Sequence, residues 1–234
     1  MKMILLAGGL GTRLKGVIGS IPKPMAPIVD SPFLEYLFTV FKKQGVKEFI
    51  VCTGHGGDAI RDYFGDGGRF GLSIRYTVER ELLGTGGAIK LAEEWIETEH
   101  FLVTNGDTYF EVDLMDMVRF HESHKGIGTV ALVHKEDPGR YGKVVCDRDN
   151  RITSFQEKPD GRKAGYINGG LYAFRKDVFH HIPENRVCSM EREILPSLIG
   201  EGLYGFPVEG YFIDIGVPED YEKAKKELPL RRTP

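Results

Sequence analysis

The chain has 234 residues, of which 41% are hydrophobic and 28% are charged, with a formal net charge of -3. This composition excludes a disordered tail, a collagen-like fibre and a coiled coil, and the near-neutral charge gives no general basic surface for nucleic acid. A chain of this length can bury a large core, so we expect one domain that needs neither disulfides nor a structural metal.

The three cysteines are odd in number and far apart in the sequence. They indicate neither a disulfide framework nor a zinc site, and they favour a reducing compartment. The apolar run at the N-terminus breaks at Gly8, too early for a signal peptide or a membrane span. We therefore expect a cytoplasmic protein that binds neither membranes nor nucleic acid.

The first half of the chain alternates strand-like and helix-like segments. Ile4–Ala7 is typical of a strand buried on both faces. Ser31-Pro32 opens a helical pattern that runs through Lys43, with the serine as N-cap. The other expected elements of this half are strands at Glu48–Thr53, Leu72–Val78 and Phe101–Thr104 and helices at Asp58–Phe64 and Gly87–Ile96. This order predicts a Rossmann-like α/β sandwich of three layers around a mixed, mostly parallel sheet.

The second half is expected to be more antiparallel. Lys143–Asp147 and Arg151–Gln156 are strand-like, and Asp149-Asn150 between them suggests a hairpin turn. The remaining predicted elements are strands at Thr129–His134, Gly169–Arg175, Tyr204–Phe206 and Tyr211–Ile213 and helices at Met190–Ile199 and Pro218–Leu228. No linker or repeat divides residues 1–234, which supports one domain.

A glycine-rich segment follows the first strand, where open α/β sheets place ligands. It reads Leu6-Ala7-Gly8-Gly9-Leu10-Gly11-Thr12-Arg13-Leu14. Its glycines let the backbone turn N–H groups toward a phosphate, and Arg13 adds a permanent charge. The segment lacks the Gly-Lys-Ser/Thr of a Walker loop and the third glycine of a dinucleotide fingerprint. On the glycines alone, a structural turn is an equally good interpretation.

Lys23 lies ten residues after Arg13 and is held between Pro22 and Pro24. Prolines on both sides restrict the loop at low entropic cost. A lone loop lysine would be interpreted as solvated. The pair with Arg13 favours two cations that converge on one polyphosphate.

These two segments, together with five later motifs, resemble the signature of the sugar-1-phosphate nucleotidyltransferases. The later motifs are Leu83-Gly84-Thr85-Gly86-Gly87-Ala88, Asn105-Gly106-Asp107, Glu157-Lys158-Pro159, Asn168-Gly169-Gly170 and Asp214-Ile215-Gly216-x-Pro218. The resemblance extends from Met1 to about Leu228 and depends on the order of the motifs. Within the family, the run Ile21–Ile28 and a chain without a C-terminal β-helix are most similar to D-glycero-α-D-manno-heptose 1-phosphate guanylyltransferases. Mannose-1-phosphate guanylyltransferases come second.

The resemblance implies a fold of the nucleotide-diphospho-sugar transferase type and a transfer from GTP to D-glycero-α-D-manno-heptose 1-phosphate, for surface glycan synthesis. It divides the chain into a nucleotide-binding half, about residues 1–110, and a sugar-phosphate-binding half, about residues 111–228. It also implies Mg²⁺ held by Asp107 and Asp214, which both end predicted strands. Asp113, Asp116 and Asp220 are expected to cap helices or turns instead.

The same resemblance assigns roles to individual residues. The implied catalytic residues are Arg13, Lys23 and Asp107. The implied nucleotide-binding residues are Leu6, Ala7, Gly8, Gly9, Gly11, Thr12, Arg13, Lys23, Gly84, Thr85 and Asp107. The implied sugar-phosphate-binding residues are Tyr141, Gly142, Glu157, Lys158, Asn168 and Gly169. Glu79 is a candidate acceptor for the N–H groups of guanine, although uridine, adenosine and thymidine stay open.

Other functions also stay open. Mannose 1-phosphate or another hexose 1-phosphate could replace the heptose. A catalytically silent sugar-nucleotide sensor or regulatory subunit would share the fold, but it would not need Arg13, Lys23 and Lys158 together with both aspartates. A nicotinamide-dependent oxidoreductase is disfavoured by the missing third glycine. Whether the chain forms a homo-oligomer is left open.

Overall fold

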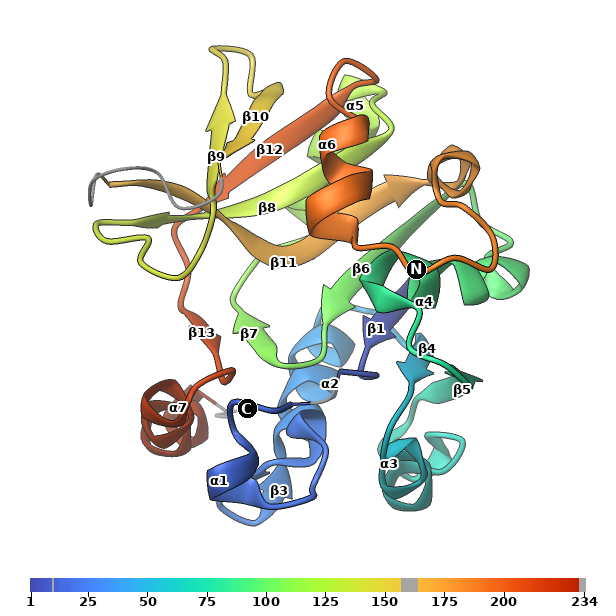
Figure 1. Ribbon diagram of the computed structural model, residues 1–234, viewed down its shortest axis with the longest axis vertical. Coiled ribbons are helices and arrows are strands. Elements are labelled where there is room, and N and C mark those ends of the chain that lie inside the picture. The colour runs from blue at the N-terminus through green and yellow to red at the C-terminus, as the bar shows by residue number, and fades with distance from the viewer. Residues whose placement is uncertain (10, 157–163, 232–234) are drawn as a thin grey trace.

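A nine-stranded sheet runs through the computed structural model, which describes residues 1–9, 11–156 and 164–231 (Figure 1). Its strands are β1 (Lys2–Leu6), β4 (Glu48–Thr53), β5 (Ser73–Val78), β6 (His100–Asn105), β8 (Gly128–Lys135), β9 (Lys143–Cys146), β10 (Ile152–Gln156), β11 (Gly165–Arg175) and β12 (Leu203–Val208). They lie in the order β10-β9-β11-β6-β1-β4-β5, and β8 pairs with both β11 and β12. The first half of the chain forms parallel pairs, and β11 is antiparallel to all three of its neighbours. The mixed sheet is the predicted one.

Helices and two small strand pairs complete the described structure. The α-helices are α1 (Lys15–Ile18), α2 (Phe33–Lys43), α3 (Gly57–Phe64), α4 (Gly84–Leu91), α5 (Leu114–His124), α6 (Leu195–Ser197) and α7 (Pro218–Arg231). The shorter turns are η1 (Lys23–Met25), η2 (Gly68–Phe70), η3 (Glu93–Trp95), η4 (Lys176–His181) and the π-helical η5 (Met190–Ile194). The small pairs are β2 (Pro27–Ile28) with β3 (Ser31–Pro32), and β7 (Thr108–Phe110) with β13 (Phe212–Asp214). Within the described ranges, no helix has the length and apolar character needed to cross a bilayer.

Two hydrophobic cores, one on each face of the sheet, make three layers. Side chains of successive residues in a strand point to opposite faces, and β1 shows this directly. Met3 and Leu5 pack in the core that α2, α3, α5 and α7 cover. Ile4, between them, packs in the core that α4, η4 and α6 cover. The continuous apolar run of the first strand thus serves both cores, which confirms the three-layer sandwich.

Two helix predictions need correction. Ser31 does not cap α2, because it belongs to β3 and pairs there with Ile28 of β2. The residue directly before the helix is Pro32, whose backbone is extended. The Ser31 hydroxyl instead donates to the Glu35 carboxylate at 3.1 Å. The helix expected over Met190–Ile199 is a π-helical turn followed by the three-residue α6. Pro196 lies in the first turn of α6, where a missing N–H is tolerated. Helix α5 and strand β7 were not predicted, and neither were the short elements α1, β2 and β3.

The carboxyl ends of β1, β4, β5 and β6 come together at one edge of the sheet. The loop after β6 is tied to β1, since the Gly106 N–H donates to the Leu6 carbonyl at 2.8 Å. A Cβ atom at position 106 would lie 2.6 Å from that carbonyl oxygen, so the approach requires glycine. The segment after β5 is fixed in the same way, because the Glu79 N–H donates to the Thr53 carbonyl at 2.8 Å.

Candidate active site

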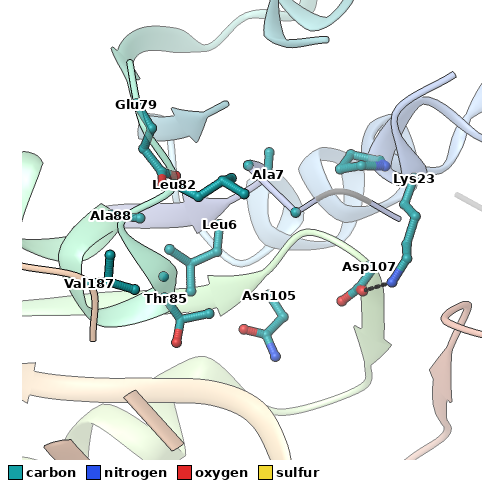
Figure 2. Close-up of a pocket in the computed structure, with 14 residues that line it drawn as sticks. Leu6, Ala7, Lys23, Glu79, Leu82, Thr85, Ala88, Asn105, Asp107 and Val187 are labelled. Atoms are coloured by element: carbon teal, nitrogen blue, oxygen red, sulfur yellow. Dashed lines mark hydrogen bonds and ion pairs between the residues drawn. The ribbon is translucent and has the colours of Figure 1, made fainter. Parts of the chain in front are cut away.

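Two cavities open at this edge of the sheet and meet at the loop after β6. The first cavity, of about 470 Å³, is lined by Leu6, Ala7, Gly8, Gly9, Lys23, Pro24, Glu79, Leu82, Gly84, Thr85, Ala88, Asn105, Asp107 and Val187 (Figure 2). The second cavity, of about 360 Å³, contains Arg13, Arg140, Tyr141, Gly142, Asn168, Gly169, Tyr172, Glu191, Arg192 and Asp214 among its lining residues. Asn105 and Asp107 line both cavities. Molecules bound in the two cavities would therefore adjoin at Asp107.

The glycine-rich loop forms one wall of the first cavity. A Cβ atom on Gly8 would lie 2.5 Å from Glu79 Oε1, whereas one on Gly9 would have no neighbour within 4 Å. The absence of a side chain at Gly8 thus lets the Glu79 carboxylate reach the cavity. At Gly9 it leaves the loop backbone accessible to a ligand in the cavity. Gly11 has a φ of 61°, which favours glycine. Gly11 and Thr12 line neither cavity, in contrast to the neighbouring predicted residues.

Glu79 places a fixed acceptor in the first cavity. Its Oε2 accepts a 2.8 Å hydrogen bond from the Leu83 N–H. Burial raises the pKa of the Glu79 carboxyl, and this hydrogen bond opposes the shift. Leu82 and Val187 line the same cavity with largely exposed apolar side chains (Figure 2). The cavity therefore offers apolar surface with a carboxylate at one side, an arrangement suited to a flat ring that carries N–H donors.

Gly84 and Thr85 bring the start of α4 to the first cavity. Gly84 has a φ of 73°, and a Cβ atom there would lie 2.5 Å from the Cys188 carbonyl oxygen. Thr85 Oγ1 donates to Glu191 Oε2 at 2.8 Å and accepts from the Met190 N–H at 2.8 Å. The Thr85 hydroxyl is thus engaged by the segment that also lines the second cavity.

Lys23 and Asp107 form an ion pair at the boundary between the cavities. Lys23 Nζ is 3.0 Å from Asp107 Oδ2, as the dashed line in Figure 2 shows. The lysine side chain is 14% exposed and the aspartate side chain 30%. A ligand anion can therefore reach a lysine whose charge is already held in place.

Asp214 lies beside Asp107 because β13 pairs with β7. The register sets Asp214 opposite Thr108, and the Ile215 N–H donates to the Asp107 carbonyl at 3.0 Å. Burial and the nearby Asp107 charge raise the pKa of Asp214, and the Arg140 guanidinium opposes that shift. Arg140 Nη2 is 3.0 Å from Asp214 Oδ2. The sequence-predicted pair of carboxylates is thus brought together in one partly buried site.

The two carboxylates are suited to bind a divalent cation between them, because two neighbouring negative charges repel each other and a shared positive ion removes that repulsion. Mg²⁺ is commonly bound by one or two carboxylates with phosphate oxygens and water. Among the described residues, no group of three or more His, Cys, Asp or Glu side chains comes together to hold a metal. Asp107 and Asp214 would therefore leave the other coordination positions to oxygen ligands from water and, once it is bound, from a substrate.

The second cavity holds hydrogen-bonding groups suited to a sugar. Asn168 donates to the hydroxyl of the buried Tyr172 at 2.9 Å and accepts from the Gly170 N–H at 2.9 Å. Tyr141, Gly142 and Gly169 also line this cavity. Glu157 and Lys158, two of the predicted sugar-phosphate residues, lie outside the described residues.

Arg13 and Lys23 line different cavities. That both cations converge on one polyphosphate stays a prediction, because the two cavities meet at Asp107. Asp107 lines both cavities, so the two cations are on either side of the boundary.

Four charged residues among those described in the second cavity were not predicted: Arg140, Lys143, Glu191 and Arg192. Arg140 directly precedes the Tyr141-Gly142 pair, and that position was the available signal. Glu191 and Arg192 belong to η5, where no motif marked them. Asp113 does cap α5, as expected, by accepting from the Asp116 N–H at 2.9 Å.

Asp116 and Asp220 also lie at helix starts. Asp116 is in the first turn of α5 and pairs with Arg119. Asp220, expected to have only a capping role, pairs with Arg140 at 2.9 Å and so belongs to the charge network of the site.

Known proteins match the chain over nearly its whole length. The D-glycero-alpha-D-manno-heptose 1-phosphate guanylyltransferase of Aneurinibacillus thermoaerophilus is 44% identical over 97% of this chain and 98% of its own length. The mannose-1-phosphate guanylyltransferase of Mycobacterium tuberculosis is 36% identical over 96% of this chain and 64% of its own length. The crystal structure of HddC from Yersinia pseudotuberculosis complexed with GMP-PN is 38% identical, with a TM-score of 0.86 over 97% of this chain and 98% of that chain.

The family model described as Nucleotidyl transferase matches residues 2–230, a range that includes both cavities and every predicted site residue. Two adjoining cavities, one next to a glycine-rich loop and the other lined by sugar-compatible polar groups, agree with that match. The chain belongs to the nucleotidyl transferase family.

Proposed function

We propose that the protein transfers a guanylyl group from GTP to D-glycero-α-D-manno-heptose 1-phosphate, giving GDP-heptose and pyrophosphate. The observation that carries this proposal is the meeting of the two cavities at Asp107. A transfer between two bound substrates requires their reacting atoms to be held next to each other. The higher identity to the heptose enzyme than to the mannose enzyme favours the heptose.

Glu79 is the proposed guanine-recognition residue. Guanine presents an N1–H and an N2 amine on one edge, and a carboxylate can accept from both. Glu79 is oriented by the Leu83 N–H, and the apolar side chains of Leu82 and Val187 line the same cavity. Uracil and thymine have a single ring N–H on that edge, so a carboxylate there selects against them.

The triphosphate is proposed to lie along the glycine-rich loop toward Asp107. The open backbone at Gly9 can approach phosphate oxygens. Lys23, which pairs with Asp107, is proposed to bind a phosphate of the nucleotide in place of that carboxylate. Arg13 lines the second cavity, which meets the first at Asp107. This exchange keeps the lysine paired throughout, because one anion replaces another.

Asp107 and Asp214 are the proposed ligands of Mg²⁺, which when bound would reduce the repulsion between the two phosphate groups. A phosphate oxygen of the sugar 1-phosphate attacks the α-phosphorus of GTP, and the bond from that phosphorus to the bridging oxygen of the β-phosphate breaks. Pyrophosphate leaves with that electron pair. The second pKa of a phosphate monoester is about 6, so the attacking oxygen is already ionised and no residue has to act as general base.

Tyr141, Gly142, Asn168 and Gly169 are proposed to hold the sugar phosphate in the second cavity, with Glu157 and Lys158 completing that site. In this proposal residues 1–234 act as one catalytic domain. About residues 1–110 bind the nucleotide and about residues 111–228 the sugar phosphate. We place the enzyme in the cytoplasm, since its three cysteines are free.

Pyrophosphate release tests the proposal. GTP, UTP, CTP and dTTP are each assayed with D-glycero-α-D-manno-heptose 1-phosphate, mannose 1-phosphate and glucose 1-phosphate. We expect GTP with the heptose to give the highest kcat/KM, mannose 1-phosphate a lower value and glucose 1-phosphate little. A pocket that bonds the extra hydroxyl of the heptose loses that bond with mannose. A preference for another base or for glucose would contradict the substrate proposal, and no release with any pair would favour a silent sensor.

A further inference from the structure

The Arg140 guanidinium joins two carboxylates of the second cavity region. Its Nη2 atom is 3.0 Å from Asp214 Oδ2 and 2.9 Å from Asp220 Oδ2. The same atom is 2.7 Å from the Tyr141 hydroxyl and 3.2 Å from the Asp214 carbonyl oxygen. One guanidinium nitrogen of this kind carries two protons, so these four oxygens share them. Loss of the Asp214 contact would still leave Arg140 bonded.

We propose that Arg140 is an internal counter-ion of the metal site. It neutralises Asp214 before a divalent cation binds, and it remains paired with Asp220 once the cation lies between Asp107 and Asp214. This inference rests on the proposed function, because it takes those two aspartates as the metal ligands.

The arrangement lowers the free-energy cost of replacing the two protein cations by a divalent metal ion. Asp107 and Asp214 are partly buried side by side, and each has its own cation in the structure: Lys23 for Asp107 and Arg140 for Asp214. An arriving ion competes with both cations. Lys23 can move to the triphosphate, whereas Arg140 already has its second carboxylate.

Two features keep Arg140 in place during the exchange. The guanidinium carbon lies 4.8 Å from the centre of the Tyr141 ring, which is favourable for an arginine. Asp220 is fixed in the first turn of α7. Arg140 is therefore not left as an uncompensated charge, which would be costly in a partly buried site.

Mn²⁺ affinity measures the competition directly, by electron paramagnetic resonance of the free ion with no nucleotide present. Arg140→Gln is expected to bind Mn²⁺ about threefold to tenfold more tightly than the wild type, because one competing charge is gone. Arg140→Lys keeps the charge and should stay near the wild-type affinity. Arg151→Gln is the matched control, since Arg151 also stacks on a tyrosine, Tyr204, but lines neither cavity.

Asp220 variants test the second carboxylate. Asp220→Asn should weaken Mn²⁺ binding more than Glu219→Gln does, because Arg140 then pairs with Asp214 alone. Glu219 lies in the same helical turn, so its variant corrects for the loss of one negative charge. In the Arg140→Gln background, the two variants should have equal effects.

The outcomes separate the two proposals. If Arg140→Gln binds Mn²⁺ no more tightly than the wild type, or if neither protein binds it measurably, the counter-ion role is wrong. Asp214→Asn tests the metal ligands themselves. Wild-type Mn²⁺ affinity in that variant would refute the metal site and the counter-ion together. Loss of Mn²⁺ in Asp214→Asn with no change in Arg140→Gln would refute only the counter-ion. Circular dichroism checks that each variant is folded.

Discussion

Thr85 Oγ1 donates a 2.8 Å hydrogen bond to Glu191 Oε2, and the two residues line different cavities. The same hydroxyl accepts from the Met190 N–H at 2.8 Å. The Ser189 hydroxyl also donates to Glu191 Oε2, at 2.9 Å. The start of α4 and the turn η5 are therefore connected by a small network around one threonine.

Removal of that hydroxyl should destabilise the protein. Thr85→Val keeps the side-chain shape but leaves the Met190 N–H without its acceptor, which costs about 1–3 kcal/mol for a buried group. Urea unfolding of Thr85→Val should show this loss in the free energy of unfolding, whereas Thr85→Ser should be close to the wild type. A valine variant as stable as the wild type would show that the network contributes nothing to stability.

The proposed metal ligands should be essential for turnover. Asp107→Asn and Asp214→Asn keep the side-chain shape and remove a negative charge that would bind the ion. We expect kcat to fall by at least about a hundredfold in each variant, the scale of losing one electrostatic contact to the transition state. Initial rates at saturating Mg²⁺, with circular dichroism as the control for folding, measure this effect. Near-normal turnover in limiting Mg²⁺ by either variant would remove the shared-ion proposal.

Glu79 should set the preference for guanine. Glu79→Gln keeps one acceptor but loses the charge, so kcat/KM for GTP should fall by about ten- to hundredfold. Inosine triphosphate lacks the N2 amine, so the ratio of GTP to inosine triphosphate activity should also shrink. Steady-state kinetics with both nucleotides measure the ratio. An unchanged ratio in Glu79→Gln would mean that another group reads the amine.

Acidification should act on the same contact. Burial raises the pKa of the Glu79 carboxyl, so it takes up a proton at a higher pH than an exposed glutamate does. The protonated form accepts poorly from guanine. The KM for GTP should therefore rise as the pH falls through the weakly acidic range, and Glu79→Gln should lose that part of the dependence.

A buried histidine should make stability depend on pH. His121 is 1% exposed, lies 3.0 Å from the Thr129 hydroxyl and meets the His100 ring edge-on. Burial, with the nearby His100, lowers the pKa of His121 from 6.5 to about 4. As the pH falls below 6.5, His121 is therefore protonated in the unfolded chain while it is still neutral in the folded protein. The contribution of His121 to stability is complete above pH 6.5 and is lost as the pH falls toward 4.

Urea unfolding at a series of pH values measures that loss. His121→Phe should flatten the fall in unfolding free energy between pH 6.5 and 4, because the histidine that resists protonation is gone. His180→Gln is the matched control, since His180 is exposed. Equal pH dependence in the wild type and His121→Phe would assign the effect to other groups.

Short sequence motifs were sufficient to predict many of the residues that line the two cavities. Asp107 and Asp214 were predicted together from the resemblance to a known family, and the antiparallel pairing of β7 with β13 sets the start of one strand beside the end of the other. The glycine-rich loop was expected beside a ligand because it follows the first strand, and Gly8 and Gly9 line the first cavity. These predictions depend on short motifs of neighbouring residues, which a sequence pattern records.

Contacts between distant segments could not be predicted in this way. Arg140 pairs with Asp214, 74 residues away, and the loop that carries it has no periodicity. Thr85 meets Glu191 across 106 residues. Asp220 has the sequence position of a capping residue, and only the fold shows that it also faces Arg140. Ser31 was assigned to the helix because the cap pattern does not show that β2 and β3 pair first.

The contact between Gly106 and the Leu6 carbonyl has a consequence for motion. It ties the loop that carries Asp107 to the strand that precedes the glycine-rich loop, so the floor that both cavities share is held to the sheet. We therefore expect adjustment to substrates of different size to come from the walls, the segments around Tyr141 and Val187. Substitutions that broaden the range of accepted sugars or bases should therefore accumulate in those walls, while the floor stays unchanged.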